Sequence, residues 1–145
     1  MPWKGHAEVT YTNLDLVEEF ELGNGEKGLR ASKDIVHGTV VGVFGGNVKP
    51  YPLVDGRLAD PGLHRILVQL RLEGDVLYGM DTGSELHGID YVNHSCTPNI
   101  GVSNQIILTA SRDIPAGEEL VTDYREWDLV LEGLHCWCSS GYCVI

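Results

Sequence analysis

Four cysteines are the residues of this sequence whose types and spacing most directly suggest chemistry. Three lie together in HCWCSSGYC as Cys136, Cys138 and Cys143, and the fourth, Cys96, lies about forty residues earlier in NHSCTPN. Two sulfurs separated by one residue can chelate a single ion, and structural Zn²⁺ takes four ligands in a tetrahedron, with thiolates preferred. The three clustered thiols and Cys96 complete such a set, so the spacing predicts one zinc site.

Two other interpretations of the cysteines stay open. Two disulfides would use all four thiols in one of three pairings, and four unrelated buried cysteines would need no partner at all. A C-x-C disulfide is strained, and the opening residues, MPWKGHAEVTYTN, lack the apolar run of a signal peptide. No stretch has the length of a membrane span. We therefore expect a nuclear or cytosolic protein with reduced thiols, which favours zinc.

The charge balance narrows the choice of partner. Ten basic and 21 acidic residues give a formal net charge of −11, which argues against direct nucleic-acid binding because such binding relies on clustered Lys and Arg. The same charge suits a basic partner or a cationic cofactor. Acidity also keeps a small protein soluble without any such partner.

The elements that must position the cysteines are short strands. With 145 residues the chain can bury one modest core, and turn signals recur every eight to twelve residues. Between them, residues 39–44, 65–72, 75–80, 101–111 and 118–124 are rich in β-branched and aromatic side chains. Residues 65–72 alternate as a half-buried strand, and a turn at 73–75 predicts a hairpin with 75–80. The pattern predicts a mostly β fold of several small sheets, with helix over 125–133 and a helical turn or two near 50–64.

One segment of the sequence occurs twice. ASKDIVHGTVV at 31–41 and ASRDIPAGEELV at 110–121 share Ala-Ser-basic-Asp-Ile-x-x-Gly, 79 residues apart. Both copies are typical of a strand end, a glycine turn and a new strand. Two copies are too few for a repeat protein, so the similarity predicts one turn chemistry used twice.

Several motifs in order resemble one family. NHSCTPN, AGEELVTDY and the C-x-C-x4-C cluster together strongly resemble the SET domain with its post-SET zinc module, a family mainly of protein-lysine methyltransferases that use S-adenosylmethionine (SAM). GEKGLRASKDIVHGTVVGVFGG and MDTGSELHGIDYVNHSC extend the resemblance, which covers about residues 8–143. It implies a SET domain at 8–126, a post-SET tail at 127–145, and a C-terminal pseudoknot that brings NHSC beside TDY. The tail would then be anchored by zinc through Cys96, over the cofactor.

The resemblance also implies roles for individual residues. Tyr124 matches the essential tyrosine, whose hydroxyl would lie at the methyl-transfer channel, and Ser95 has a structural role in the turn. Trp137 is a candidate lid on the adenine, with Trp127 a weaker one. The residues that would contact SAM are the backbone of Lys27, Gly28 and Leu29, the amide of Asn93 and the backbone and ring of His94.

Departures from the family pattern concern the acceptor side. Thr122 stands where an aromatic residue is usual, and Phe44 where tyrosine is common, so the resemblance implies a wider and less polar lysine channel. Glu26 replaces a glycine of the Gly-x-Gly segment, Asp90 an arginine, and Ser139 another glycine.

These observations predict a SAM-dependent methyltransferase that acts on lysine in a basic protein segment such as a histone tail, with SAM and Zn²⁺ as cofactors. Neither nucleic acid nor a membrane is expected as a direct partner. A SET-fold enzyme that acts on a small molecule is one alternative, and a non-catalytic module that binds SAM or a peptide is another. Retention of Tyr124 argues against the non-catalytic module.

Overall fold

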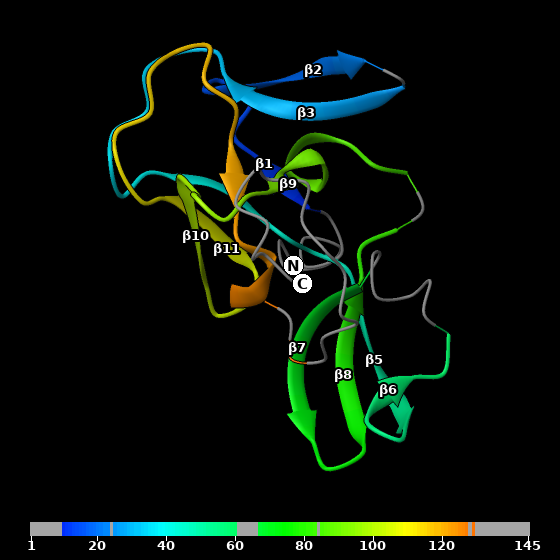
Figure 1. The fold of residues 1–145 in the computed structure, drawn as a ribbon. Helices are drawn as coiled ribbons and strands as arrows, with labels where there is room; N and C mark the ends of the chain where they lie inside the picture. Colours follow the sequence, from blue (N-terminus) through cyan, green and yellow to red (C-terminus); the bar gives the residue numbers. More distant parts are fainter. Residues whose placement is uncertain (1–9, 24, 61–66, 84, 128, 130–145) are drawn as a thin grey trace, which may run out of the picture.

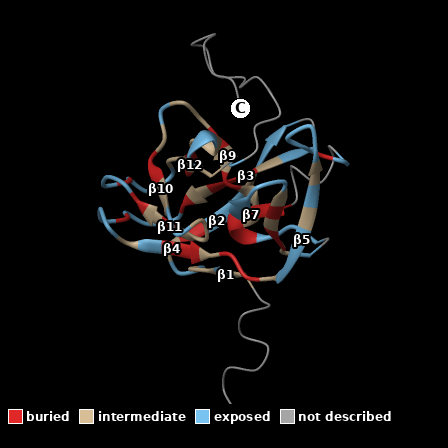
Figure 2. Ribbon diagram, turned by 90° about the horizontal axis from the view of Figure 1, so that it is seen from below, coloured by how far each residue is buried: buried red, intermediate tan, exposed pale blue. Residues whose placement is uncertain are grey.

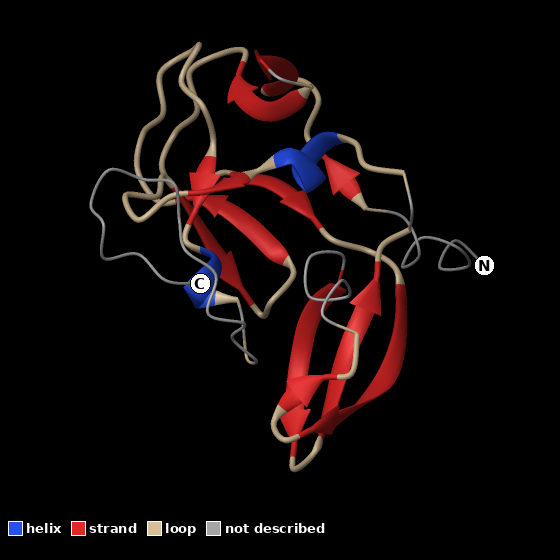
Figure 3. Ribbon diagram, turned by 45° about the vertical axis from the view of Figure 1, so that its right-hand side comes forward, coloured by secondary structure: helices blue, strands red, loops and turns tan. Residues whose placement is uncertain are grey.

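The computed structural model describes residues 10–23, 25–60, 67–83, 85–127 and 129. The chain is mostly β, as the sequence predicted, and forms three small sheets (Figures 1 and 3). The largest has the strand order β1-β4-β11-β10-β12-β9. Its strands are β1 (Tyr11–Thr12), β4 (Val40–Val43), β9 (Asn93–His94), β10 (Ile100–Ser103), β11 (Ile107–Ala110) and β12 (Val121–Thr122).

Two smaller sheets lie at opposite ends of this central sheet (Figure 1). One is the hairpin of β2 (Val17–Gly23) and β3 (Glu26–Ala31). The other has the order β6-β5-β8-β7 and consists of β5 (Asn47–Val54), β6 (Arg57–Leu58), β7 (Leu67–Glu73) and β8 (Val76–Asp81). Two 3-10 helices, η3 (Gly88–Tyr91) and η4 (Tyr124–Glu126), flank the central strands. Within the described residues, no helix has the length and apolar character needed to cross a membrane.

Two parallel pairings bring the NHSC and TDY motifs together. β12 lies between β10 and β9 and pairs in parallel with both, with Thr122 opposite His94 on one side and Ile100 on the other. A late strand thus occupies the space between two strands that follow one another in the chain. The implied proximity of the two motifs is confirmed.

The repeated segments pair with each other through two-fold reciprocal contacts. Ile35 and Ile114 exchange both backbone hydrogen bonds at 2.8 Å. Asp34 accepts from the Ala116 amide at 2.9 Å, and Asp113 accepts from the His37 amide at 2.8 Å. The repeat is therefore more than one turn chemistry used twice, because each copy caps the turn of the other.

The hairpin of β7 and β8 confirms the turn predicted at 73–75, but the burial along β7 differs from simple alternation. Leu67, Val68 and Gln69 are all buried, whereas Leu72 is 41% exposed. The pairing shifts by one residue between Gln69 and Arg71. The inner half of β7 is covered on both faces by the body of the protein, while its outer half extends beyond it.

The helical turn predicted near 50–64 is wrong over 50–60, where β5 and β6 lie. Asp55 and Gly56 both have positive φ, 52° and 76°, and connect the two strands as a tight hairpin. Pro50 and Pro52 are tolerated in β5 because strand pairing covers only one edge there within the described residues. Of the helix predicted over 125–133, the described part contributes only to the short η4, and the remainder lies outside the described residues.

The main core lies between the sheets rather than on one face of any of them. Buried residues occupy the central strands, and the distal part of the β5–β8 sheet is largely exposed (Figure 2). Fully buried side chains come from β3, β4, β10 and β11 and from both repeated segments, and include Leu29, Val41, Ile100, Leu108 and Ile114. A second, smaller cluster of Leu58 and Leu77 with Tyr51 and Leu53 stabilises the distal sheet.

Candidate active site

Tyr124 begins η4, at the point where β12 leaves the central sheet. Its amide donates to His94 Nδ1 at 2.9 Å, and its hydroxyl donates to the carbonyl oxygen of Val92 at 2.8 Å. Both contacts reach across about thirty residues of sequence, so the NHSC segment fixes the position and orientation of this tyrosine. Its ring lies 5.2 Å from that of His94, centroid to centroid.

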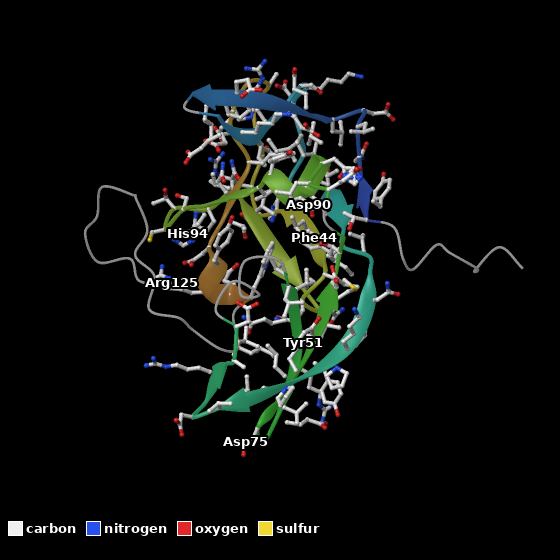
Figure 4. The ribbon with its side chains drawn as sticks, turned by 90° about the vertical axis from the view of Figure 1, so that its right-hand side faces the viewer. Phe44, Tyr51, Asp75, Asp90, His94 and Arg125 are labelled. Carbon is white, nitrogen blue, oxygen red and sulfur yellow. The ribbon has the colours of Figure 1, made fainter. Side chains whose placement is uncertain are left out.

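His94 is buried, and protein groups meet both of its ring nitrogens. Because Nδ1 accepts from the Tyr124 amide, we infer that the proton is on Nε2, which lies 3.7 Å from the sulfur of Cys96. Burial lowers the pKa of His94, and the Asp123 carboxylate nearby opposes the shift. The buried His94 ring, labelled in Figure 4, therefore contacts both the Tyr124 amide and the Cys96 sulfur.

Asn93 connects the predicted cofactor strand to the segment that leads into Tyr124. Its side-chain amide donates to the carbonyl oxygen of Lys27 and to Glu119 Oε2, both at 3.2 Å. With both contacts made by the nitrogen, the Oδ1 atom has no hydrogen-bond partner within the described residues. Because its side-chain nitrogen is fixed by two hydrogen bonds, Asn93 can use this oxygen to accept from an ammonium group.

Gly28 is required by close packing beside Asn93. A Cβ atom there would lie 2.8 Å from Glu119 Oε2 and 3.0 Å from the Phe20 ring. Leu29, the next residue, is fully buried, and its carbonyl accepts from the Leu120 amide at 2.8 Å. The Lys27–Leu29 backbone thus lies against the segment that leads into β12, and its contact with SAM stays a prediction.

Two further aromatic side chains extend the ring contacts of Tyr124. Trp127 stacks on Tyr124, with centroids 5.8 Å apart and ring planes 20° from parallel. Phe44 meets the indole edge-on, at 5.4 Å and 88°. Three aromatic residues from two distant segments form one cluster, with Trp127 in its middle.

Thr122 lies in the core with its side chain fully buried, and its hydroxyl donates to the Ile100 carbonyl at 3.0 Å. The small side chain therefore satisfies its polar group within the sheet, and no aromatic ring stands at this position. Phe44 is also buried, with 6% of its surface exposed. Their roles as channel residues stay predictions.

Asp90 occupies the position where the family pattern has arginine, and it has a structural use here. Its carboxylate accepts from the His87 amide at 3.2 Å, which caps η3, and its side chain is 6% exposed. Burial raises the pKa of Asp90, and the carboxylate of Glu19 adds to the shift. An arginine at this place would bring a longer side chain and the opposite charge.

Asp123 and Arg125 form a local pair on either side of Tyr124. The guanidinium donates to both carboxylate oxygens, with an Nη2 to Oδ2 distance of 2.6 Å, and the Arg125 amide donates to Oδ1 at 3.0 Å. These contacts lower the pKa of the Asp123 carboxyl. Asp123 thereby caps η4, next to Arg125, which is labelled in Figure 4.

The remaining predicted residues cannot be placed. Cys136, Cys138, Cys143 and Trp137 lie outside the described residues. Cys96 is disulfide-bonded in this structure, and its partner is not among the described residues. A disulfide at Cys96 agrees with the disulfide interpretation, and coordination of zinc by Cys96 stays a prediction. Within the described residues, no group of three potential metal ligands occurs.

Sequence reasoning missed three residues that the structure brings into the site: Glu119, Gln69 and Gln105. Glu119 precedes the TDY motif and could have been suspected from the doubled glutamate in GEELVTDY. Gln69 resembles an ordinary polar position in an alternating strand. Gln105 resembles a turn residue, and neither carries a local signal for its long-range contacts.

Comparison with known proteins agrees with this geometry. The SET domain family matches residues 26–125, more than half of the chain, and this protein belongs to that family. The histone-lysine N-methyltransferase of Yarrowia lipolytica described as H3 lysine-36 specific is 29% identical over an alignment of 145 residues, which covers 92% of this chain and 18% of the relative. The Arabidopsis thaliana histone-lysine N-methyltransferase ATX2 is 32% identical over 107 residues, covering 63% of this chain and 10% of that protein.

Shorter and structural similarities point to the same family. An H3 lysine-4 specific histone-lysine N-methyltransferase of Emericella nidulans is 41% identical over 63 residues, or 37% of this chain and 5% of the relative. The crystal structure of KRYPTONITE in complex with mCHH DNA, H3(1-15) peptide and SAH has a TM-score of 0.60 at 21% identity, covering 88% of this chain and 28% of that one, and shows a shared fold. The chain spans less than a fifth of the length of these curated relatives.

Proposed function

We propose that this domain transfers a methyl group from SAM to a lysine side chain of a histone-like protein segment. The observation that carries the proposal is the parallel pairing of β9 with β12, which sets Asn93 opposite Val121 and His94 opposite Thr122, with His94 Nδ1 in contact with the Tyr124 amide. Asn93 is tied to the Lys27–Leu29 strand, so one connected unit contains both the predicted cofactor residues and the predicted catalytic residue.

The residues present suit the aminoacyl end of SAM. The Asn93 Oδ1, which has no hydrogen-bond partner within the described residues, can accept from an ammonium group. When bound, SAM supplies an electrophilic methyl group on a sulfonium. The protein must then align a neutral amine in line with that methyl and exclude water.

Tyr124 is suited to orient the amine. Its hydroxyl proton is donated to the Val92 carbonyl at 2.8 Å, so the oxygen is oriented as an acceptor toward anything on its other side. An amine N–H that donates to this oxygen would direct its lone pair elsewhere, toward the methyl group. Hydrogen bonds that become stronger in the transition state of methyl transfer than in the ground state increase the rate of the chemical step.

A basic tail is the substrate class we infer. The relatives named above are histone-lysine methyltransferases, two of them described as specific for H3 lysines. The net charge of −11 favours encounter with a positively charged segment. A histone substrate would place the protein in the nucleus.

We also propose that Cys96 and the three cysteines of the tail, residues 136, 138 and 143, hold one Zn²⁺ in a post-SET module at 127–145. The His94 Nε2–H near the Cys96 sulfur would stabilise a thiolate there. Metal analysis of protein purified without chelator would give close to one zinc per chain. Protein without metal and without free thiols would instead establish the two-disulfide interpretation.

The direct test is transfer of labelled methyl from SAM to recombinant histones and to H3 peptides, with the labelled residue located by mass spectrometry. SAM binding is measured separately by calorimetry, and Asn93→Ala serves as the variant that should lose it. Labelled lysine in the wild type supports the proposal. Absence of both SAM binding and labelling would refute it.

A further inference from the structure

The carboxylate of Glu119 differs in its partners from that of the neighbouring Glu118. Glu118 Oε2 accepts from the Asn99 side-chain amide at 2.8 Å and pairs with the Arg112 guanidinium. Glu119 Oε2 accepts from the Asn93 side-chain amide at 3.2 Å, and within the described residues no basic side chain pairs with it. Half-buried Glu119 therefore places a negative charge without a cationic partner beside the proposed SAM site.

The two basic side chains of β3 pair with other acids. Lys27 Nζ lies 3.6 Å from Glu19 Oε1, and Arg30 Nη2 lies 3.5 Å from Glu18 Oε2. Glu119 and Arg30 are connected only through their backbones, by an antiparallel bridge. The strand that packs on Glu119 therefore does not supply the cation that would balance its charge.

The same carboxylate decides which way the Asn93 amide is turned. The Lys27 carbonyl and the Glu119 carboxylate both lie 3.2 Å from the amide nitrogen, and both groups can only accept hydrogen bonds. Rotation of the amide by half a turn would bring its oxygen against these two acceptors and remove both hydrogen bonds. The nitrogen must therefore face them, which leaves Oδ1 available to a donor from outside.

Glu119 is itself held in place from two directions. Its carbonyl accepts from the side-chain amide of the buried Asn99 at 2.8 Å. On the other side, a Cβ atom at Gly28 would lie only 2.8 Å from Glu119 Oε2, so the carboxylate packs directly on β3. Its contact with Asn93 thus depends on the absence of a side chain at residue 28.

We propose that Glu119 is a positioning residue of the SAM site, which orients the Asn93 amide oxygen toward the ammonium group of SAM and supplies a negative charge that attracts this group. The inference rests on the proposed function, because it concerns the amino group of the cofactor. Glu119 acts through Asn93 by the hydrogen bond and through space by its charge. The site thereby favours ligands that carry the amino group.

The test compares two ligands by calorimetry, S-adenosylhomocysteine and its analogue without the amino group. The wild type should bind S-adenosylhomocysteine more tightly on the order of tenfold or more, the scale of one hydrogen bond to a charged group. In Glu119→Gln the charge is lost and the new amide can also donate, so this preference should fall several-fold, toward about equal affinity. Glu118→Gln is the matched control, because the same change at the neighbouring residue affects Asn99 instead of Asn93 and should keep the preference. A purely structural defect would weaken both ligands equally.

Gly28→Ala gives a second, independent variant if Glu119→Gln does not fold. Its added methyl group would displace Glu119 Oε2 without changing the carboxylate, and the preference for the amino group should fall in the same direction. A preference that is unchanged in the variants, or absent in a wild type that binds both ligands, would overturn the inference and leave the proposed function standing. A wild-type protein that binds neither SAM nor S-adenosylhomocysteine would refute the proposed function, and the inference with it.

Discussion

Removal of the Tyr124 hydroxyl should impair the chemical step while leaving the fold nearly unchanged. Tyr124→Phe keeps the ring that stacks on Trp127 and loses the 2.8 Å hydrogen bond to the Val92 carbonyl. The loss of one such bond lowers the free energy of unfolding by about 1 kcal/mol. For a domain stable by only about 5 kcal/mol, more than roughly 99% of the molecules would still be folded. Unfolding can therefore not account for a large change in rate.

The rate itself should fall on the order of a hundredfold or more, as is usual when a positioned transition-state group is lost. Single-turnover methyl transfer from labelled SAM measures this step, and calorimetry with S-adenosylhomocysteine should give an affinity within about threefold of the wild type, which is less than about 1 kcal/mol. Tyr91→Phe is a matched control, because its hydroxyl also donates to a carbonyl, that of Leu86 at 3.1 Å. Equal rates for the two variants would refute the assignment of Tyr124.

Three further predictions concern stability. Asp34→Ala and Asp113→Ala should each lower the free energy of unfolding by about 1 kcal/mol in urea titrations. The effect of the double variant should differ from the sum of the two single effects by at least about 0.5 kcal/mol, because both hydrogen bonds hold the same pair of turns. Strict additivity would argue against reciprocal capping. Burial raises the pKa of Asp90, so its charged form is disfavoured in the folded state, and the resulting loss of stability sets in as pH rises above the ordinary value of 3.8. Asp90→Asn should accordingly raise the melting temperature at pH 7 but not at pH 3, and an equal change at both pH values would contradict this reasoning. Removal of zinc by a chelator should lower both the melting temperature and the affinity for SAM, and unchanged values in metal-free protein would contradict a post-SET zinc module.

Local sequence signals predicted the strands wherever a turn and a β-branched run occur together. The β7–β8 hairpin and β4 were predicted in this way, and the segment 101–111 forms two strands around a turn at Asn104 and Gln105. The helical turn predicted near residues 50–64 failed over 50–60, a segment that contains two prolines and an Asp-Gly pair. The prolines lie instead in the part of β5 that pairs along one edge within the described residues, and the Asp-Gly pair forms a two-residue hairpin turn.

The candidate site could be predicted where its residues lie in compact motifs, and not where it depends on single long-range contacts. Asn93, His94 and Tyr124 were identified from the motifs that contain them, but only through resemblance to a known family. Periodicity cannot show that β12 enters between β9 and β10. Gln69 and Gln105 are ordinary in their local sequence, because their contacts with the Trp127–Leu129 segment depend on the three-dimensional path of the chain.

The repeated segments explain how the two halves of the site are held in register. The second copy follows β3 in the antiparallel direction, with the Ala31 amide donating to the Glu118 carbonyl and the Leu120 amide to the Leu29 carbonyl. The chain that continues from this pairing becomes β12 and ends at Tyr124, while β3 itself contains the Lys27–Leu29 segment. Reciprocal capping by the two aspartates therefore joins the strand proposed to lie along SAM to the strand that carries the proposed catalytic tyrosine. Loss of either aspartate should affect methyl transfer through the spacing of donor and acceptor, even in molecules that remain folded, because small errors of alignment slow an in-line displacement strongly.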